Sequence, residues 1–223
     1  MKNNKLALCV LAKYPSVGNV KIRLAKDIDP NKAVDLYYKL LINTIHQVDL
    51  TKIPHDTFVV SSDFENKYLL ESMFLGKFNV IFYKEKSLGI LIRDIFYDFI
   101  IKKGYSKTLV ICSDSPFIEP GLILEAYNAL EKRNTLFISP SSDGGYSLVG
   151  LNKFVDVFSS IIMSTSKVLE ETLEAAKSFR LSIYTSSTVD DIDTIEDIYK
   201  LREKINNHHD PSGVVRKELN SII

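Results

Sequence analysis

The sequence predicts an α/β fold in which a mostly parallel sheet carries helices on both faces. Strand-like and helix-like segments alternate along the chain, which is typical of parallel sheets with helical crossovers. The apolar runs Leu6–Leu11 and Thr108–Cys112 are continuous, as expected for central strands that are buried on both faces. The 223 residues suffice for one domain with one core. We therefore expect a single domain over residues 1–204, followed by a C-terminal tail over residues 205–223.

The first half of the chain contains three strand-like segments with helical segments between and after them. The first helix begins at Asp29-Pro30, a favourable N-cap residue followed by proline at the first helical position. The third helix ends before Gly104, a residue suited to a helix C-terminus. The predicted strands are Leu6–Leu11, Thr57–Val60 and Phe78–Tyr83, and the predicted helices are Pro30–Val48, Glu65–Phe74 and Leu88–Ile101.

The second half repeats the alternation of strands and helices. A helix opens at Pro120, and a tight Asp143-Gly144-Gly145 turn precedes one of the strands. The sequence leaves open whether the tail that follows packs on the body, contacts a partner or stays loose. The predicted strands are Thr108–Cys112, Thr135–Ser139, Gly145–Leu151 and Leu181–Thr185, and the later helices are Ser166–Phe179 and Thr194–Lys204.

Composition and charge exclude several classes of protein. Lys+Arg and Asp+Glu number 28 each, and this balance argues against bulk electrostatic binding to nucleic acid. The sequence has no run of about 18 apolar residues, so we expect no membrane span. Its N-terminus lacks the pattern of a signal peptide. The two cysteines, Cys9 and Cys112, lie in apolar runs, and we expect buried free thiols in a cytoplasmic protein. A homodimer is left open.

A basic, turn-rich loop follows the first strand. It contains Pro15 and Gly18 for turning, and Lys13, Lys21 and Arg23 as cations. Lys and Arg neutralise phosphate oxygens, so the loop is a candidate polyphosphate site. It matches neither the G-x-x-x-x-G-K-[ST] nor the G-x-G-x-x-G pattern. The alternative is that these three cations are ordinary solvated surface.

Acidic residues follow later strands, where the carboxyl ends of parallel strands form ligand crevices. Asp114 ends an apolar strand, and its carboxylate suits Mg²⁺ or Mn²⁺; alternatively it caps the next helix. Asp193 is either a second such ligand or a helix N-cap. The Asp143-Gly144-Gly145 turn is either a simple turn or a place where a ligand approaches the backbone. Tyr146 could stack on a ligand ring or pack in the core.

Four segments, in this order, resemble one family. They are Leu11–Leu24, Ser113–Pro116, Asp143–Leu151 and Asp191–Asp197. The family comprises glycosyltransferase-like proteins of bacteria and archaea, catalogued as a domain of unknown function and in part labelled selenium-domain-associated transferases. It belongs to the nucleotide-diphospho-sugar transferase superfamily, and 2-phospholactate guanylyltransferase is a more distant likeness. The resemblance covers roughly residues 6–204.

This resemblance implies a GT-A-like, three-layer α/β/α sandwich with a mixed sheet and a nucleotide beside the first strand. It also implies a role for each matched residue. The implied nucleotide-binding residues are Leu11, Ala12, Lys13, Gly18, Lys21 and Arg23; the implied catalytic residues are Lys21, Arg23 and Asp114; the implied ligands of Mg²⁺ or Mn²⁺ are Asp114 and Asp193; and the implied acceptor or sugar side is Asp143, Gly144, Gly145 and Tyr146.

The leading hypothesis is a divalent-metal-dependent transferase that uses a nucleotide or nucleotide-sugar donor and a small acceptor. The absence of a clear general base favours nucleotidyl transfer, whereas the family label favours glycosyl transfer. The rival is a non-catalytic, nucleotide-binding regulatory module on the same fold. A metal-dependent phosphohydrolase is a third reading that the acidic strand ends would also suit. No nucleophile elbow or histidine pattern supports nucleophilic catalysis.

Overall fold

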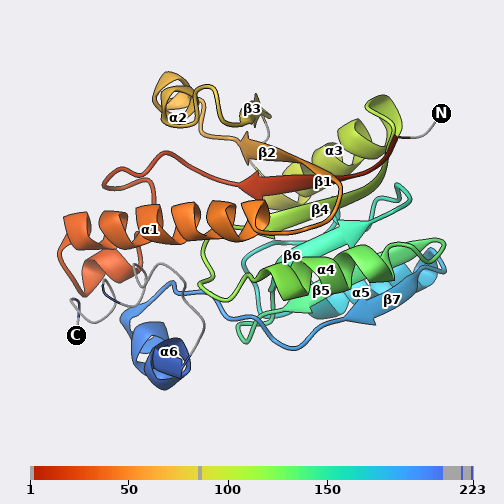
Figure 1. Ribbon diagram of the computed structural model, residues 1–223. Helices are drawn as coiled ribbons and strands as arrows, with labels where there is room; N and C mark the ends of the chain where they lie inside the picture. The colour runs from red at the N-terminus through yellow and green to blue at the C-terminus, as the bar shows by residue number, and fades with distance from the viewer. Residues whose placement is uncertain (1–2, 85–86, 208–216, 218–221, 223) are drawn as a thin grey trace.

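The computed structural model describes residues 3–84, 87–207, 217 and 222, and its centre is a seven-stranded sheet. The strand order is β3-β2-β1-β4-β6-β5-β7, and the sheet twists through the middle of the molecule (Figure 1). The strands are β1 (Asn3–Leu11), β2 (His55–Ser61), β3 (Asn79–Phe82), β4 (Tyr105–Cys112), β5 (Thr135–Pro140), β6 (Tyr146–Leu151) and β7 (Ser182–Thr185).

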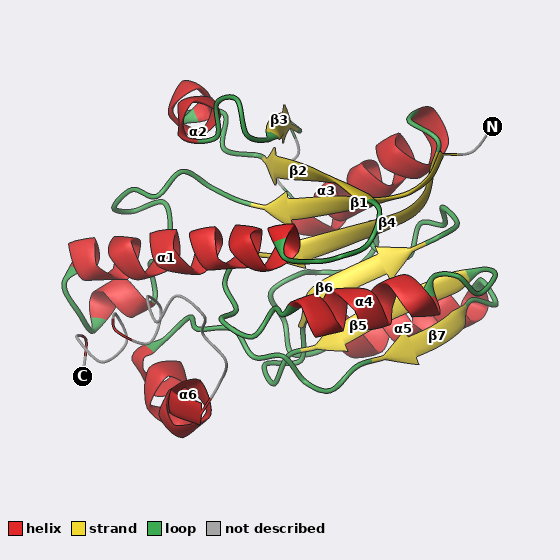
Figure 2. Ribbon diagram, viewed as in Figure 1, coloured by secondary structure: helices red, strands yellow, loops and turns green. Residues whose placement is uncertain are grey.

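Helices cover both faces of this sheet (Figure 2). Helices α1, α4 and α6 contribute to one hydrophobic cluster, which contains Leu8 of β1. Helices α3 and α5 contribute to a second cluster on the opposite face, which contains Cys9 of the same strand. The helices are α1 (Pro30–Asp49), α2 (Lys67–Met73), α3 (Leu88–Phe96), α4 (Pro120–Ala129), α5 (Val168–Ser178) and α6 (Ile195–Asn207), with a short 3₁₀ helix η1 (Leu24–Lys26) after the basic loop.

The predicted fold class is confirmed: the sheet is mixed, mostly parallel and sandwiched between helices. Strand β1 pairs in parallel with β2 and β4, and its alternate side chains enter the two clusters. Strand β6 alone runs antiparallel to its neighbours β4 and β5. Only residues 141–145 separate β5 from β6, and so short a connection permits an antiparallel pair but no parallel crossover.

Helix α1 begins as the sequence predicts. The side chain of Asp29 accepts a hydrogen bond from the N–H of Asn31 at 2.8 Å, and Pro30 occupies the first helical position. Proline costs nothing there, because the first N–H groups of a helix have no intrahelical partner.

The predicted helix Leu88–Ile101 differs in its second half. The α-helix α3 ends at Phe96, and residues Tyr97–Lys102 form a π-helix, η2. The N–H of Lys103 bonds to the carbonyl oxygen of Asp98, five residues back, at 2.8 Å. This wider turn inserts one residue into the repeat. Gly104, with φ of 74°, follows it as predicted and leads into β4.

The other predicted boundaries agree with the structure to within a few residues. Helix α6 extends to Asn207, three residues beyond the predicted end of the domain, and most of the predicted tail lies outside the described residues. Among the described residues, no helix is both long and apolar enough to cross a membrane. Both cysteines are free thiols. Cys9 is buried as predicted, whereas Cys112 is partly exposed because it lines a cavity.

Candidate functional site

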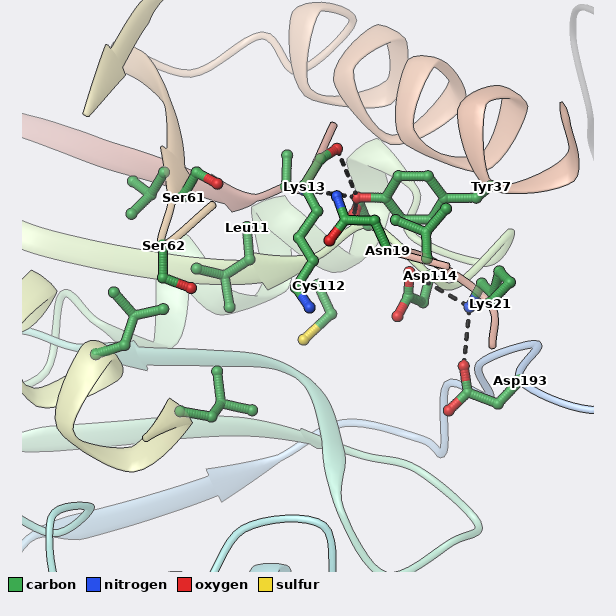
Figure 3. A pocket seen from close by; sticks show the side chains of 16 residues that line it. Leu11, Lys13, Asn19, Lys21, Tyr37, Ser61, Ser62, Cys112, Asp114 and Asp193 are labelled. Carbon is green, nitrogen blue, oxygen red and sulfur yellow. Dashed lines mark hydrogen bonds and ion pairs between the residues drawn. The ribbon is translucent and has the colours of Figure 1, made fainter. Parts of the chain in front are cut away.

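A cavity of about 280 Å³ opens at the carboxyl ends of β1, β2 and β4. Figure 3 shows it with the side chains that line it. The predicted residues Leu11, Ala12, Lys13, Lys21, Asp114 and Asp193 all lie in its wall, together with Asn19, Val20, Tyr37, Val60, Ser61, Ser62, Leu88, Leu91, Cys112 and Ser113. Segments from both ends of the sequence therefore meet in one crevice, where ligands of α/β sheets bind.

Lys21 lies between two carboxylates at the floor of this crevice. Its Nζ is 2.9 Å from Oδ1 of Asp193 and 3.4 Å from Oδ1 of Asp114, as the dashed lines in Figure 3 mark. The side chain of Lys21 is only 2% exposed, whereas those of Asp114 and Asp193 are 38% and 47% exposed. The alternative of ordinary solvated surface is therefore wrong for Lys21, which is buried and pairs with two cavity-facing carboxylates.

The electrostatics of this triad favour its charged form. Burial by itself lowers the pKa of the Lys21 ammonium, but the attraction of Asp114 and Asp193 outweighs burial and raises that pKa above its ordinary value. Burial by itself raises the pKa of Asp193, and Lys21 and Arg23 outweigh it and hold that pKa below its ordinary value. Lys21 is therefore positively charged at neutral pH, and Asp193 is negatively charged.

The backbone of Lys21 adopts an unusual conformation. Its φ is 47°, in the left-handed region that residues other than glycine rarely adopt. Contacts at both ends of the residue hold this conformation: the carbonyl oxygen of Lys21 accepts the N–H of Ala25 at 2.9 Å, and the side chain pairs with Asp114 and Asp193.

Tyr37 of α1 holds the backbone that follows β1 in position. Its hydroxyl accepts the N–H of Lys13 at 2.9 Å and lies 3.4 Å from the hydroxyl of Ser113. Burial, with a further contribution from Asp114, raises the pKa of Tyr37 to about 12, so its hydroxyl stays protonated at neutral pH. Tyr37 was not among the predicted site residues; it is buried in α1, and it also lines the first cavity.

A second cavity, of about 230 Å³, lies on the other side of Asp193. It receives Arg23 and Asp143, which the resemblance placed with the nucleotide and with the acceptor, respectively. Its lining residues are Arg23, Ser141, Ser142, Asp143, Asp191, Asp193, Thr194 and Asp197. Asp193 lines both cavities, so the two are adjacent. The structure thus separates Arg23 from Lys13 and Lys21, which line the first cavity.

The Asp143-Gly144-Gly145 turn is built by local hydrogen bonds and one close approach. Asp143 accepts hydrogen bonds from the N–H of Gly145 and the hydroxyl of Ser141. Gly144 has φ of 88°, and a Cβ there would lie 2.1 Å from the carbonyl oxygen of Ser166. Tyr146 packs its ring against the second hydrophobic cluster and lines neither described cavity. Of the two positions considered for Tyr146, the structure therefore shows packing in the core.

The structure contradicts two helix-cap readings. Asp114 does not cap the next helix, because α4 begins six residues later at Pro120 with Glu119 as its N-cap. Asp193 does not cap α6, because its side chain pairs with Lys21. Instead, Thr194 and Asp197 form the cap: the hydroxyl of Thr194 accepts the N–H of Asp197 at 3.3 Å, and the carboxylate of Asp197 accepts the N–H of Thr194 at 2.9 Å. Both acidic residues are thus left to face the cavity.

A divalent cation fits this donor set only in part. The structure holds no cluster of three or more metal-ligating side chains among its described residues. Asp114 and Asp193, however, supply two partly exposed carboxylates at the same point, 3.4 and 2.9 Å from one ammonium nitrogen. Mg²⁺ is commonly held by one or two carboxylates, with phosphates and water completing its shell. The residues present therefore suit a metal that arrives with a phosphorylated ligand.

The sequence matches a protein family over residues 44–165, a span of more than half the chain. That family is described as an uncharacterized protein conserved in bacteria, DUF2064. The chain belongs to the DUF2064 family. The matched span includes Asp114 and the Asp143–Tyr146 turn of this DUF2064 protein, whereas Lys21 and Asp193 lie outside it. No curated protein matches the sequence.

Solved structures show that the fold of this DUF2064 protein is shared. A protein of Desulfovibrio desulfuricans, provisionally described as a nucleotide-diphospho-sugar transferase, is 22% identical, with a TM-score of 0.85 over 99% of this chain and 97% of the other. A 4-diphosphocytidyl-2C-methyl-D-erythritol synthase of Anaerococcus prevotii is 11% identical, with a TM-score of 0.60 over 92% and 97%. A nucleotidyl transferase of Methanothermobacter is 12% identical, with a TM-score of 0.56 over 91% and 98%. These structures confirm the predicted fold.

Proposed function

We propose that this protein is a transferase that takes a nucleotide or nucleotide-sugar donor and passes one part of it to a small acceptor. The observation that carries the proposal is the charged triad Lys21–Asp114–Asp193 at the floor of the first cavity, beside the exposed Lys13. A cation between carboxylates, at the carboxyl ends of parallel strands, suits a polyphosphate accompanied by a metal.

The donor would occupy the first cavity in two parts. Its phosphates would face Lys13 and Lys21, because ammonium groups neutralise phosphate oxygens. Its base or ribose would lie towards the apolar wall and meet the backbone of Leu11 and Ala12, beside the small polar Ser61. Gly18 lines neither described cavity, and its φ of 82° allows the loop to turn between Lys13 and Lys21.

Asp114 and Asp193 would hold the Mg²⁺ or Mn²⁺ that the proposal includes. The metal, when bound, would supply positive charge at the donor's phosphates. Lys21 would stabilise the negative charge that develops as the donor is cleaved, with electrostatic positioning as the main contribution of the protein. Tyr37 would keep Lys13 in place through its hydrogen bond to the Lys13 N–H.

The acceptor would occupy the second cavity. This cavity adjoins the first across Asp193 and is lined by Asp143, whereas Gly144 and Gly145 of the same turn do not line it. Arg23 would then bind an anionic group of the acceptor, or a donor phosphate that extends past Asp193. The position of Arg23 in this cavity, apart from Lys13, supports the first of these roles.

Nucleotidyl transfer is the reaction we favour. One of the similar structures, from Methanothermobacter, is named a nucleotidyl transferase, although it shares only the fold with this chain. Such a reaction needs in-line attack by an acceptor oxygen on the α-phosphorus and release of pyrophosphate. It requires positioning rather than a protein nucleophile. Glycosyl transfer, the alternative, would release a nucleoside diphosphate.

The released product distinguishes these reactions. The purified protein is incubated with Mg²⁺ or Mn²⁺, a panel of nucleoside triphosphates and nucleotide-sugars, and phosphorylated or hydroxylated acceptors. Acceptor-dependent pyrophosphate supports nucleotidyl transfer, and an acceptor-dependent nucleoside diphosphate supports glycosyl transfer. Saturable nucleotide binding without either product across the panel would favour the non-catalytic module, and phosphate release without an acceptor would favour a hydrolase.

A further inference from the structure

Asn19, in the basic loop, has a side-chain amide whose orientation is fixed by its neighbours. Its Nδ2 donates to the carbonyl oxygen of Tyr14 at 2.8 Å and to the carboxylate of Asp63 at 2.7 Å. Both partners only accept hydrogen bonds. A flipped amide would place its oxygen against two acceptors, so the NH₂ group must face Tyr14 and Asp63.

Asp63 is itself held firmly in place. Its carboxylate also accepts the N–H of Tyr14 at 3.0 Å and the N–H of Asn66 at 3.3 Å, and its own N–H donates to the hydroxyl of Ser61 at 3.1 Å. Asp63 follows β2, whereas Tyr14 and Asn19 follow β1. The carboxylate of Asp63 is therefore hydrogen-bonded to both of the loops that form one wall of the first cavity.

This arrangement leaves one atom of Asn19 for a ligand. Asn19 lines the first cavity, but Tyr14 and Asp63 do not. With both protons of Nδ2 directed away, Oδ1 is the polar atom of this side chain that remains for the cavity, and no described residue donates to it. Figure 3 shows Asn19 among the residues of the wall that includes Lys13 and Lys21.

The chemistry of Oδ1 restricts what it can meet. An amide oxygen accepts hydrogen bonds, so it repels phosphate oxygens and requires a donor on the ligand. Asn19 lies two residues before Lys21, near the place where the donor's phosphates would bind. The hydroxyl groups of the ribose are the donors joined most closely to those phosphates.

We propose that Asn19, oriented by Asp63, accepts a hydrogen bond from the 2′- or 3′-hydroxyl of the ribose and discriminates against nucleotides that lack that hydroxyl. This inference deepens the proposed function and rests on it. A ligand that lacks the hydroxyl leaves Oδ1 without a partner in the complex. One neutral hydrogen bond of this kind corresponds to about a three- to tenfold change in Kd.

Calorimetric titration tests the proposal without requiring turnover. The probes are ATP, GTP, CTP and UTP with Mg²⁺, followed by the 2′-deoxy and 3′-deoxy forms of whichever binds most tightly. The wild-type protein is expected to bind one deoxy form about three- to tenfold more weakly. N19L is expected to bind the ribonucleotide more weakly by the same factor and to bind all three forms alike. N66A is the matched control, because it removes a different donor to Asp63 and keeps Asn19; it should retain the discrimination.

A second measurement separates orientation from contact. D63A is expected to reduce the discrimination, and its effect should not add to that of N19L, because both remove the same hydrogen bond to the ribose. Equal binding of all three forms by the wild-type protein, or unchanged discrimination in N19L, would overturn the role of Asn19 and leave the proposed function intact. No binding of any of the four nucleoside triphosphates would overturn this inference together with the nucleotidyl transfer that we favour.

Discussion

The ammonium nitrogen of Lys21 lies 2.9 Å from a carboxylate oxygen of Asp193, and 172 positions separate these two residues in the sequence. This ion pair ties the loop after β1 to the segment before α6. It places the buried cation at the boundary between the two cavities, because Asp193 lines both of them. The pair is thus both a long-range tertiary contact and a part of the candidate site.

We predict that K21M destabilises the protein and that part of this loss disappears when Asp193 is also changed. Removal of the ammonium leaves two carboxylates close together without a counter-charge. Because both carboxylates are partly exposed, we expect about 1–3 kcal/mol, less than for a fully buried pair. Urea unfolding of K21M, D193N and the double variant gives the coupling energy. Strictly additive effects would show that the two residues do not interact.

We predict that D114N folds normally and loses metal-dependent turnover by about 10²-fold or more. The carboxylate of Asp114 is partly exposed and faces the cavity, and Lys21 keeps Asp193 as a partner when Asp114 is neutralised. The melting temperature of D114N should stay close to that of the wild type. D35N, which changes an exposed carboxylate on α1, is the matched control and should keep full activity. Full activity of D114N would remove Asp114 from the mechanism.

We predict that the contribution of Asp63 to stability depends on pH. Burial by itself raises the pKa of this carboxyl, but hydrogen bonds from Tyr14, Asn19 and Asn66 outweigh burial and hold the pKa below its ordinary value of 3.8. The folded protein therefore keeps Asp63 ionised at pH values where the unfolded chain binds a proton. The resulting stabilisation is complete well above pH 3.8 and is lost as the pH falls through the lowered pKa.

D63N removes this dependence. At pH 7, we expect the variant to be less stable than the wild type by about 1–2 kcal/mol. At pH 3, the difference should be smaller, because the wild-type protein is then losing the same contribution. Denaturant unfolding at the two pH values measures both differences. A difference of equal size at pH 3 and pH 7 would contradict this role of the carboxylate.

We predict that G144A is destabilising by about 2 kcal/mol or more. Gly144 has a positive φ, and an added Cβ would lie 2.1 Å from the carbonyl oxygen of Ser166, which is backbone and cannot rotate away. G121A is the matched control, since Gly121 lies in α4 with no atom within 4 Å of an added Cβ. Alanine there should leave stability unchanged or raise it slightly. Thermal unfolding of both variants tests this prediction. A G144A variant as stable as the wild type would contradict the close approach of Ser166 to Gly144.

Much of the fold could be predicted from the sequence, because its elements carry local signals. The apolar run Leu6–Leu11 and the Asp29-Pro30 helix start depend on burial and capping, which neighbouring residues largely determine. The direction of β6 was not predicted, although the connection of five residues from β5 contained that information. The π-helix of Tyr97–Lys102 had no signal in the apolar pattern, which is nearly the same for α and π turns over so short a segment.

The sequence predicted which residues lie at the site better than it predicted how those residues interact there. Asp114 and Lys21 were selected because strand ends gather ligands, and the structure places both in one cavity. That Lys21 is buried between carboxylates could not be predicted, since it depends on Asp193 from the far end of the chain. Asn19 and Tyr37 were missed for different reasons. Asn19 is uncharged and so was not selected with the cations of its loop, and Tyr37 belongs to a helix rather than to a strand end.

The most direct test of the site as a whole is a thermal-shift screen of nucleoside triphosphates and nucleotide-sugars, with and without Mg²⁺ or Mn²⁺, on the wild-type protein and D114N. A ligand that binds only the folded state stabilises it by about 2.7 kcal/mol at a hundredfold excess over its Kd. We predict that at least one nucleotide raises the melting temperature of the wild type in a metal-dependent manner, and that D114N loses the metal-dependent part. No shift with any nucleotide would contradict the assignment of the Lys21 cavity to a nucleotide donor.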